Sequence, residues 1–340
     1  MRNFTSLWIR TLSLVILMTT FQPMDDASSQ PVNIDAAKKE GKVVVYGTLV
    51  PQSANLLHKG FEQKYGIKVE FWRGPSTQIV DRTLAESRAG RPGFDVVEAG
   101  REPMLLIKNQ AVFAKYVPPS SEKFPEELKE KDALTTVWRA LPISILYNTE
   151  LLKPGEAPKS IDDLLDPKWK NKISISDPTR NITSVQYLWN LKKSKGEKWL
   201  DFVRALAKQQ PHLVESLAPV TNAIIKGESS VGITFIKYVK QYKGPIDYVT
   251  MDKYLSTANY LGVGGNTLHP NAGRLYIEYA CSAEGQKIAA QDAEFVFYPG
   301  IYPPIRNAEQ VARNLVLLDN VPEDEFKKVS AELRQIFFAR

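Results

Sequence analysis

The sequence predicts an α/β protein built from two lobes. Its 340 residues exceed the roughly 250–300 residues at which a single hydrophobic core stops growing. Strand-like and helix-like segments alternate along two separate blocks of the chain, which is typical of α/β architecture. The composition, with 43% hydrophobic and 24% charged residues, is ordinary for a folded protein and excludes a mostly disordered chain.

The first block contains three predicted strands separated by two predicted helices. Residues 42–46 (KVVVY) form an apolar run typical of a buried strand, and residues 67–72 alternate like a second strand. A third short strand is expected at 94–97, and apolar residues recur at helical spacing in 53–65 and 76–89. This alternation indicates a parallel sheet, in which ligands bind at the carboxyl ends of the strands.

Polar residues stand at those strand ends. Thr48 follows the first strand, Arg73 and Ser76 follow the second, and Arg101 follows the third. We predict these four residues as ligand contacts. For the two arginines, the alternative is an ordinary surface charge.

The second block begins after residue 138 and again mixes strands with helices. Apolar runs and alternating patterns predict strands at 141–147, 172–176, 231–235, 246–249 and 258–263. Helical spacing predicts helices at 182–191, 199–207, 272–281, 283–291 and 322–338.

The N-terminus has the pattern of a signal peptide. Arg2 and Arg10 precede an apolar segment at 11–21, which is short for a membrane-spanning helix. Small residues follow, and we expect cleavage near Ser29, so that 1–29 is a signal peptide and the mature protein is exported. An uncleaved membrane anchor is the alternative. The single cysteine, Cys281, lies in an apolar stretch and is predicted to be buried.

Several function classes find no support in the sequence. The net charge is +6, but no block of clustered Lys and Arg suggests nucleic-acid binding. P-loop, GxSxG and HExxH motifs are absent from the sequence, and no pair of carboxylates stands out by its spacing. The three histidines are far apart, and His58 is expected on a solvent-facing side of its helix. We therefore predict neither an enzyme nor a bound cofactor.

Three stretches of the chain resemble one known family. They are 146–152 (LYNTELL), 157–173 (APKSIDDLLDPKWKNKI) and 282–286 (SAEGQ). They are similar to the periplasmic solute-binding proteins of ABC transporters, in the extracellular solute-binding family 1 that includes ferric-iron-binding proteins. The resemblance implies an exported periplasmic monomer that delivers a small ligand to a membrane permease and its ATPase.

The same resemblance implies a type II periplasmic-binding-protein fold, with two α/β lobes, hinge crossovers and a ligand cleft between the lobes. One lobe is expected to comprise 30–138 plus 262–298, and the other 139–261 plus 299–340. The chain is expected to cross between them near 139–145, 259–264 and 298–304. Such proteins close on their ligand by a hinge motion.

Of the two adjacent tyrosines that the iron-binding members of this family use, this chain has one. Those members place two adjacent tyrosines after a strand that follows a Gly-Glu turn. In the matching stretch, which begins at Gly227-Glu228, the two places hold Lys237 and Tyr238. A lysine ammonium cannot ligate a ferric ion and repels it. We therefore predict no metal site. If the cargo is nevertheless ferric iron, Tyr238 is the predicted ligand. The alternative role of Tyr238 is ordinary packing.

The resemblance also points to an anion-binding turn. The family's anion-contacting segment matches 177–183, where a turn opens into a helix and can offer free backbone N–H groups. The candidate contacts in this part of the chain are Thr179, Arg180, Asn181, Thr183 and, at the start of a later helix, Ser216. Lys237 and Tyr238 are further candidate contacts of the ligand. Simple helix capping, with Arg180 in solvent, is the alternative.

The predicted function is capture of a small anion, such as a phosphonate or a phosphorylated or carboxylated metabolite. The alternative cargo is ferric iron. Two alternatives of another class are a module that presents its ligand to a membrane sensor and a secreted enzyme with an unfamiliar active site.

Overall fold

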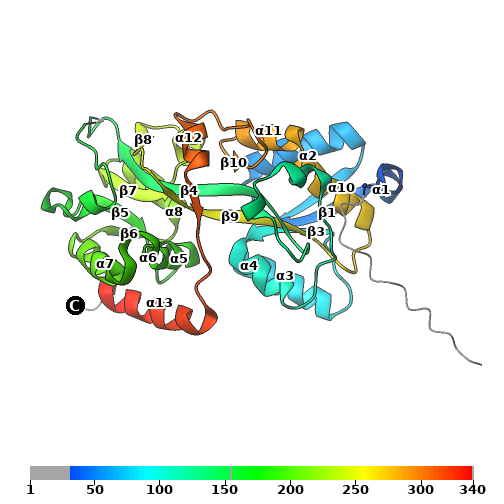
Figure 1. The fold of residues 1–340 in the computed structure, drawn as a ribbon, viewed down its shortest axis with the longest axis horizontal. Helices are drawn as coiled ribbons and strands as arrows, with labels where there is room; N and C mark the ends of the chain where they lie inside the picture. The colour runs from blue at the N-terminus through cyan, green and yellow to red at the C-terminus, as the bar shows by residue number, and fades with distance from the viewer. Residues whose placement is uncertain (1–30, 154, 339–340) are drawn as a thin grey trace, which may run out of the picture.

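The computed structural model describes residues 31–153 and 155–338. It shows an elongated molecule in which two lobes are joined by long strands (Figure 1). The predicted signal peptide, 1–29, and its cleavage near Ser29 lie outside the described residues. Within the described ranges, no helix combines the length and the apolar character needed to cross a bilayer.

The first lobe is built on three parallel strands. Strand β1 (Lys42–Gly47) lies between β2 (Lys68–Arg73) and β3 (Val96–Gly100). All three predicted strands are confirmed, each within a few residues. The helices of this lobe are α1 (Ile34–Glu40), α2 (Pro51–Tyr65), α3 (Ser76–Arg88), α4 (Arg101–Lys108), α10 (Pro270–Cys281) and α11 (Ala283–Gln291).

The second lobe repeats the arrangement. Strand β5 (Ile173–Ser176) lies between β6 (His212–Val214) and β7 (Val231–Phe235) and is parallel to both. Strand β8 is Ile246–Tyr248. The helices are α5 (Ile182–Asn190), α6 (Lys192–Lys195), α7 (Trp199–Lys208), α8 (Leu217–Ile225), α9 (Tyr238–Gln241) and α13 (Glu323–Phe338).

Two long antiparallel strands run through both lobes. Strand β4 (Thr136–Asn148) and strand β9 (Tyr254–Val263) pair with each other. In the first lobe β9 also pairs with β3, and in the second lobe β4 also pairs with β7. The main path of the sheet is therefore β2-β1-β3-β9-β4-β7-β5-β6, continuous from lobe to lobe. The backbone hydrogen bonds of β4 and β9 form the hinge.

A third passage joins the lobes near the C-terminus. Strand β10 (Phe295–Val296) pairs with β4, and the chain then reaches the second lobe. There the Arg306 side chain donates to the Tyr248 carbonyl at 2.8 Å. Helix α12 (Ala308–Arg313) and strand β11 (Leu315–Leu317) follow, and β11 runs parallel to the start of β9.

Two hydrophobic clusters fill the lobes, one around β1, β3, α2 and α10 and one around β5, β7, α5, α7 and α13. Cys281 is buried, as predicted. The expectation for His58 is wrong, because its side chain is only 7% exposed. Helix α2 is covered by β2, α10 and α11 at once, so the face that carries His58 also packs. Its Nε2 atom lies 3.0 Å from the Tyr276 hydroxyl.

Candidate functional site

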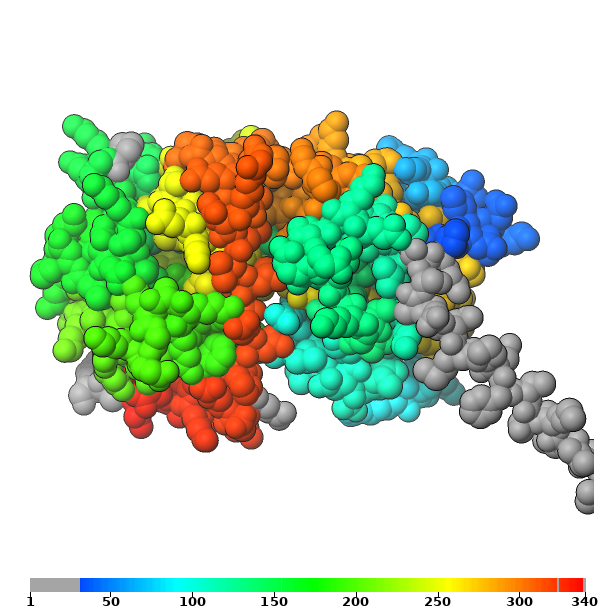
Figure 2. Space-filling view, in the orientation of Figure 1, coloured from blue at the N-terminus to red at the C-terminus, as the bar shows by residue number. Residues whose placement is uncertain are grey.

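The carboxyl ends of strands from both lobes meet near the middle of the hinge. Gly100, at the end of β3, is paired with Asn259 of β9, which in turn is paired with Arg139 of β4. Phe235, at the end of β7, is paired with Ile143, four residues farther along β4. Figure 2 shows a hollow between the two lobes. The ends of parallel strands are where open α/β sheets bind ligands.

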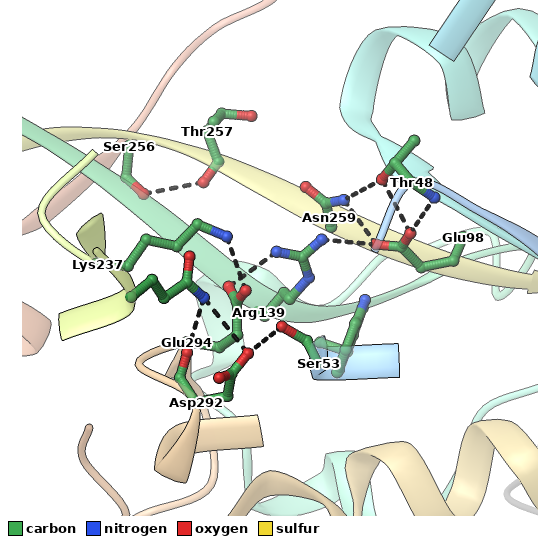
Figure 3. A network of polar contacts seen from close by, with 12 residues as sticks. Thr48, Ser53, Glu98, Arg139, Lys237, Ser256, Thr257, Asn259, Asp292 and Glu294 are labelled. Atoms are coloured by element: carbon green, nitrogen blue, oxygen red, sulfur yellow. Dashed lines mark hydrogen bonds and ion pairs between the residues drawn. The ribbon is translucent and has the colours of Figure 1, made fainter. Parts of the chain in front are cut away.

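A charge cluster is buried at this meeting point (Figure 3). We call it the hinge cluster, and its members are Glu98, Arg139, Lys237 and Glu294. Arg139 donates from Nη2 to Glu98 at 3.0 Å and from Nη1 to Glu294 at 2.8 Å. Lys237 Nζ lies 2.8 Å from the other oxygen of Glu294. Glu98 and Glu294 are each 1% exposed, Arg139 3% and Lys237 6%.

Burial and neighbouring charges compete inside the hinge cluster. Burial alone would raise the pKa of Glu294, but Arg139 and Lys237 outweigh burial and hold the pKa below its ordinary value. For Lys237 burial prevails over the attraction of Glu294, so its pKa is lowered. Each buried charge therefore depends on its partners. The ammonium of Lys237, a predicted ligand contact, is engaged by Glu294.

Thr48 is tied to the same cluster. Its backbone N–H and its hydroxyl donate to one Glu98 oxygen, at 2.8 and 2.9 Å. Asn259 donates to the other Glu98 oxygen at 2.6 Å and to the Thr48 hydroxyl at 3.2 Å. Glu98 thereby holds the loop between β1 and α2 against the hinge.

Asp292 extends the network to both lobes. Its carboxylate accepts hydrogen bonds from Ser53 and, at 2.7 Å, from Gln52, both on α2 of the first lobe. Its backbone carbonyl accepts from Gln241 Nε2, on α9 of the second lobe, at 2.8 Å.

Tyr238 begins α9 beside the cluster. Its ring lies 5.7 Å from that of Phe235 and 5.1 Å from that of Tyr242, between ring centroids. Burial raises the pKa of its phenol, and the nearby phenol of Tyr242 adds to the rise. Without a bound cation, the Tyr238 phenol is therefore held in its neutral form.

In the predicted anion-binding turn, some hydrogen-bond donors are already bonded to acceptors of the turn itself. The Asp177 carboxylate accepts from the Thr179 N–H at 2.7 Å and from its hydroxyl at 2.8 Å. Asn181 caps α5 by accepting from the Ser184 N–H at 3.1 Å. Thr179 and Asn181 thus stabilise the turn. Arg180 is exposed and has no ion pair among the described residues.

A small pocket opens at the start of α5. Thr183 lines it, together with Ser176 at the end of β5. The buried Ser176 hydroxyl has no hydrogen-bond partner in the described part of the chain. Ser216 precedes α8, and its side chain makes no capping bond to the residues described. The other lining residues are Ile143, Ile175, Ser184, Tyr187, Leu188, Leu217 and Ile233.

The remaining predicted contacts lie in the first lobe, outside the hinge cluster. Arg73 is exposed, and its Nε donates to the Leu49 carbonyl at 3.0 Å. Ser76 is the first residue of α3. Arg101 is the first residue of α4, and its Nη1 lies 3.4 Å from the Leu318 carbonyl of the other lobe.

Sequence reasoning missed Glu98 and Glu294, and it named Arg139 and Asn259 only as the starts of hinge crossings. A signal was present, because Glu98, Arg139 and Asn259 are isolated polar residues within predicted or observed strands, and Glu294 directly precedes the apolar strand β10. Charged side chains are almost never fully buried without a partner. The sequence does not show which partner each one meets.

Solved structures share the fold over nearly the whole chain. Iron-bound HitA from Pseudomonas aeruginosa has a TM-score of 0.71 and 19% identity, with 87% of this chain and 99% of that chain covered. The periplasmic binding protein AfuA from Actinobacillus pleuropneumoniae, with fructose-6-phosphate bound, has a TM-score of 0.69 and 22% identity, with 87% and 96% covered. The predicted type II periplasmic-binding-protein fold is confirmed.

Relatives are found among known proteins as well. An uncharacterised protein of Haemophilus influenzae is 28% identical over 75% of this chain and 77% of its own length. The Fe(3+)-binding periplasmic protein of Serratia marcescens is 20% identical over 78% and 81%. A putative 2-aminoethylphosphonate-binding periplasmic protein of Salmonella typhimurium is 28% identical over 49% and 48%.

One family model spans the hinge and part of each lobe. It is described as bacterial extracellular solute-binding protein, and it matches residues 92–319. The chain belongs to the bacterial extracellular solute-binding protein family.

Proposed function

We propose that this chain captures a small anionic solute between its lobes in the periplasm and delivers it to the permease of an ABC importer. Family membership supports the receptor role, and the name of the Salmonella relative supports an anionic cargo. The proposal includes cleavage near Ser29, a monomer, an ATPase partner and a binding role without catalysis. It also includes the two lobes as divided above, 30–138 plus 262–298 and 139–261 plus 299–340.

The main observation in favour of an anionic cargo is the pocket at the start of α5. The buried Ser176 hydroxyl is a donor without a partner among the described residues, and it lines the same pocket as Thr183. The first N–H groups of a helix have no acceptor within the helix, and the helix dipole favours negative charge there. Arg180, two residues before α5 begins, adds an exposed guanidinium. These donors together suit a phosphonate, phosphate or carboxylate.

Ferric iron is the second candidate, because the Serratia relative and the HitA structure are named for iron. Tyr238 is the residue that would ligate it. One feature weighs against this cargo. Lys237 places a buried positive charge next to Tyr238.

Arg180→Ala is expected to weaken binding of 2-aminoethylphosphonate by about 1.5–3 kcal/mol, the usual range for a hydrogen bond to a charged group. Thr183→Val should weaken it by about 1 kcal/mol, since it removes one neutral donor. Titration calorimetry measures both. Arg91→Ala, at an exposed arginine of the first lobe, is the control. Equal affinity in wild type and Arg180→Ala would contradict the anion site.

The same variants distinguish an anionic cargo from ferric iron. If iron is bound, ferric salt should produce a tyrosinate-to-iron absorbance that Tyr238→Phe abolishes, while Arg180→Ala has little effect. Native mass spectrometry of wild-type protein purified without refolding would show a co-purified cargo directly. A mass increase that corresponds to iron alone would contradict the anionic cargo and support ferric iron.

A further inference from the structure

Besides the hinge strands, side-chain hydrogen bonds join the described parts of the two lobes on two sides. One contact is on the hinge-cluster side, where Lys237 and Gln241 of the second lobe meet Glu294 and Asp292. The segment that carries these acids belongs to the first lobe. It follows α11, which packs on α2, and Ser53 of α2 donates to Asp292.

The second contact joins α4 of the first lobe to α5 of the second. Gln186 Nε2 donates to Glu102 Oε1 at 3.1 Å. Beside it, Arg101 Nη1 lies 3.4 Å from the Leu318 carbonyl. We call this set the rim contact. The segment that follows β11 is held by the second lobe, because Asn190 of α5 donates to the Asp319 carbonyl at 2.9 Å.

The two contacts differ in what their separation would cost. Parting Lys237 from Glu294 would leave the buried Lys237 ammonium without the partner that compensates its burial, although Glu294 would keep Arg139. Removing the partner of a buried charge is strongly destabilising. Glu102 and Arg101 are only half-buried, so water replaces their partners when the lobes part. A hydrogen bond exchanged for water contributes on the order of 1 kcal/mol. The rim contact is therefore the less costly of the two to separate.

We propose that Gln186 and Glu102 are the closing contact of the protein, and that the lobes open at this rim while the hinge cluster stays intact as the pivot. The two side chains act as positioning residues, because they bind each other and not the solute. The effect on affinity rests on the proposed function, whereas the effect on lobe separation does not. A ligand held by both lobes is bound more tightly when the closed state is already populated.

A matched pair of glutamine variants tests the proposal by small-angle scattering on the solute-free protein. Gln186→Ala should raise the radius of gyration, because it removes the rim hydrogen bond. Gln241→Ala removes an equivalent amide from the pivot side and should leave the radius of gyration unchanged. The swap variant Glu102→Gln with Gln186→Glu exchanges acid and amide and should restore the wild-type value, whereas Gln186→Glu alone should open the protein further by repulsion from Glu102.

An unchanged radius of gyration in both Gln186→Ala and Gln186→Glu would overturn the proposal, as would opening in Gln241→Ala instead. Calorimetry with 2-aminoethylphosphonate adds an independent reading. Gln186→Ala should weaken binding about fivefold, the factor that corresponds to one hydrogen bond, and the swap should recover it. If wild type does not bind this probe, the proposed cargo fails while the scattering result still decides whether the rim closes the lobes.

Discussion

Arg139→Met is expected to lower the free energy of unfolding by roughly 3–5 kcal/mol. The guanidinium contacts both Glu98 and Glu294, and all three side chains are almost completely buried. Without Arg139, Glu98 loses its only ion pair among the described residues, and Glu294 keeps only Lys237. Methionine fills a similar volume, so the loss measures the charge and not a cavity. Chemical denaturation gives the change as a shift in midpoint at constant slope.

Arg204→Met is the matched control for this prediction. Arg204 pairs with Glu332 on the surface, where the two side chains are 47% and 37% exposed. Exposed pairs contribute less than about 1 kcal/mol, so the control should unfold nearly like wild type. If Arg139→Met and Arg204→Met lose similar amounts of stability, the hinge cluster does not hold the lobes together as described.

Acid should destabilise the protein through His58, by about 3 kcal/mol between pH 7 and pH 4. Burial lowers the pKa of His58 from 6.5 to about 4, against the weaker attraction of Glu98. In the unfolded chain His58 takes up a proton as the pH falls below about 6.5, but in the folded protein it stays neutral until about pH 4. Stability is therefore full above pH 6.5 and is lost progressively as the pH falls through this window.

Comparison with His58→Gln isolates this effect. Glutamine can still hydrogen-bond the Tyr276 hydroxyl but does not titrate, so the variant should lose less stability between pH 7 and pH 4 than wild type. The exposed His212 gives the control, since His212→Gln should follow the wild-type curve. Parallel pH profiles for wild type and His58→Gln, measured by denaturation at each pH, would show that His58 does not carry the acid sensitivity.

Much of the fold was predictable from local patterns. The strands around 42–46 and 231–235 are continuous apolar runs, and such runs form buried strands whatever their neighbours are. The prediction that failed, for His58, rested on a helix having one buried face. Helix α2 is covered on several sides, and the number of covered faces depends on how the lobe is assembled.

The site was only partly predictable. The positions of Arg180, Asn181 and Thr183 follow from a turn that opens into a helix, which is a local feature, and Asn181 does cap α5. The role of Lys237 was not predictable in the same way. Its partner, Glu294, is 57 residues away in sequence, and no local pattern relates the two.

The sequence by itself determined the two α/β blocks, the apolar strands and the segments that begin helices, because these depend on hydrophobic periodicity and on capping chemistry between residues a few positions apart. Only the tertiary structure decided which charges are neutralised. The sheet brings Glu98, Arg139 and Glu294 from three distant segments into one buried cluster. Buried charges are stable only when they are paired with opposite charges or hydrogen-bonded. The tertiary structure also buries the Ser176 hydroxyl without a hydrogen-bond partner among the described residues.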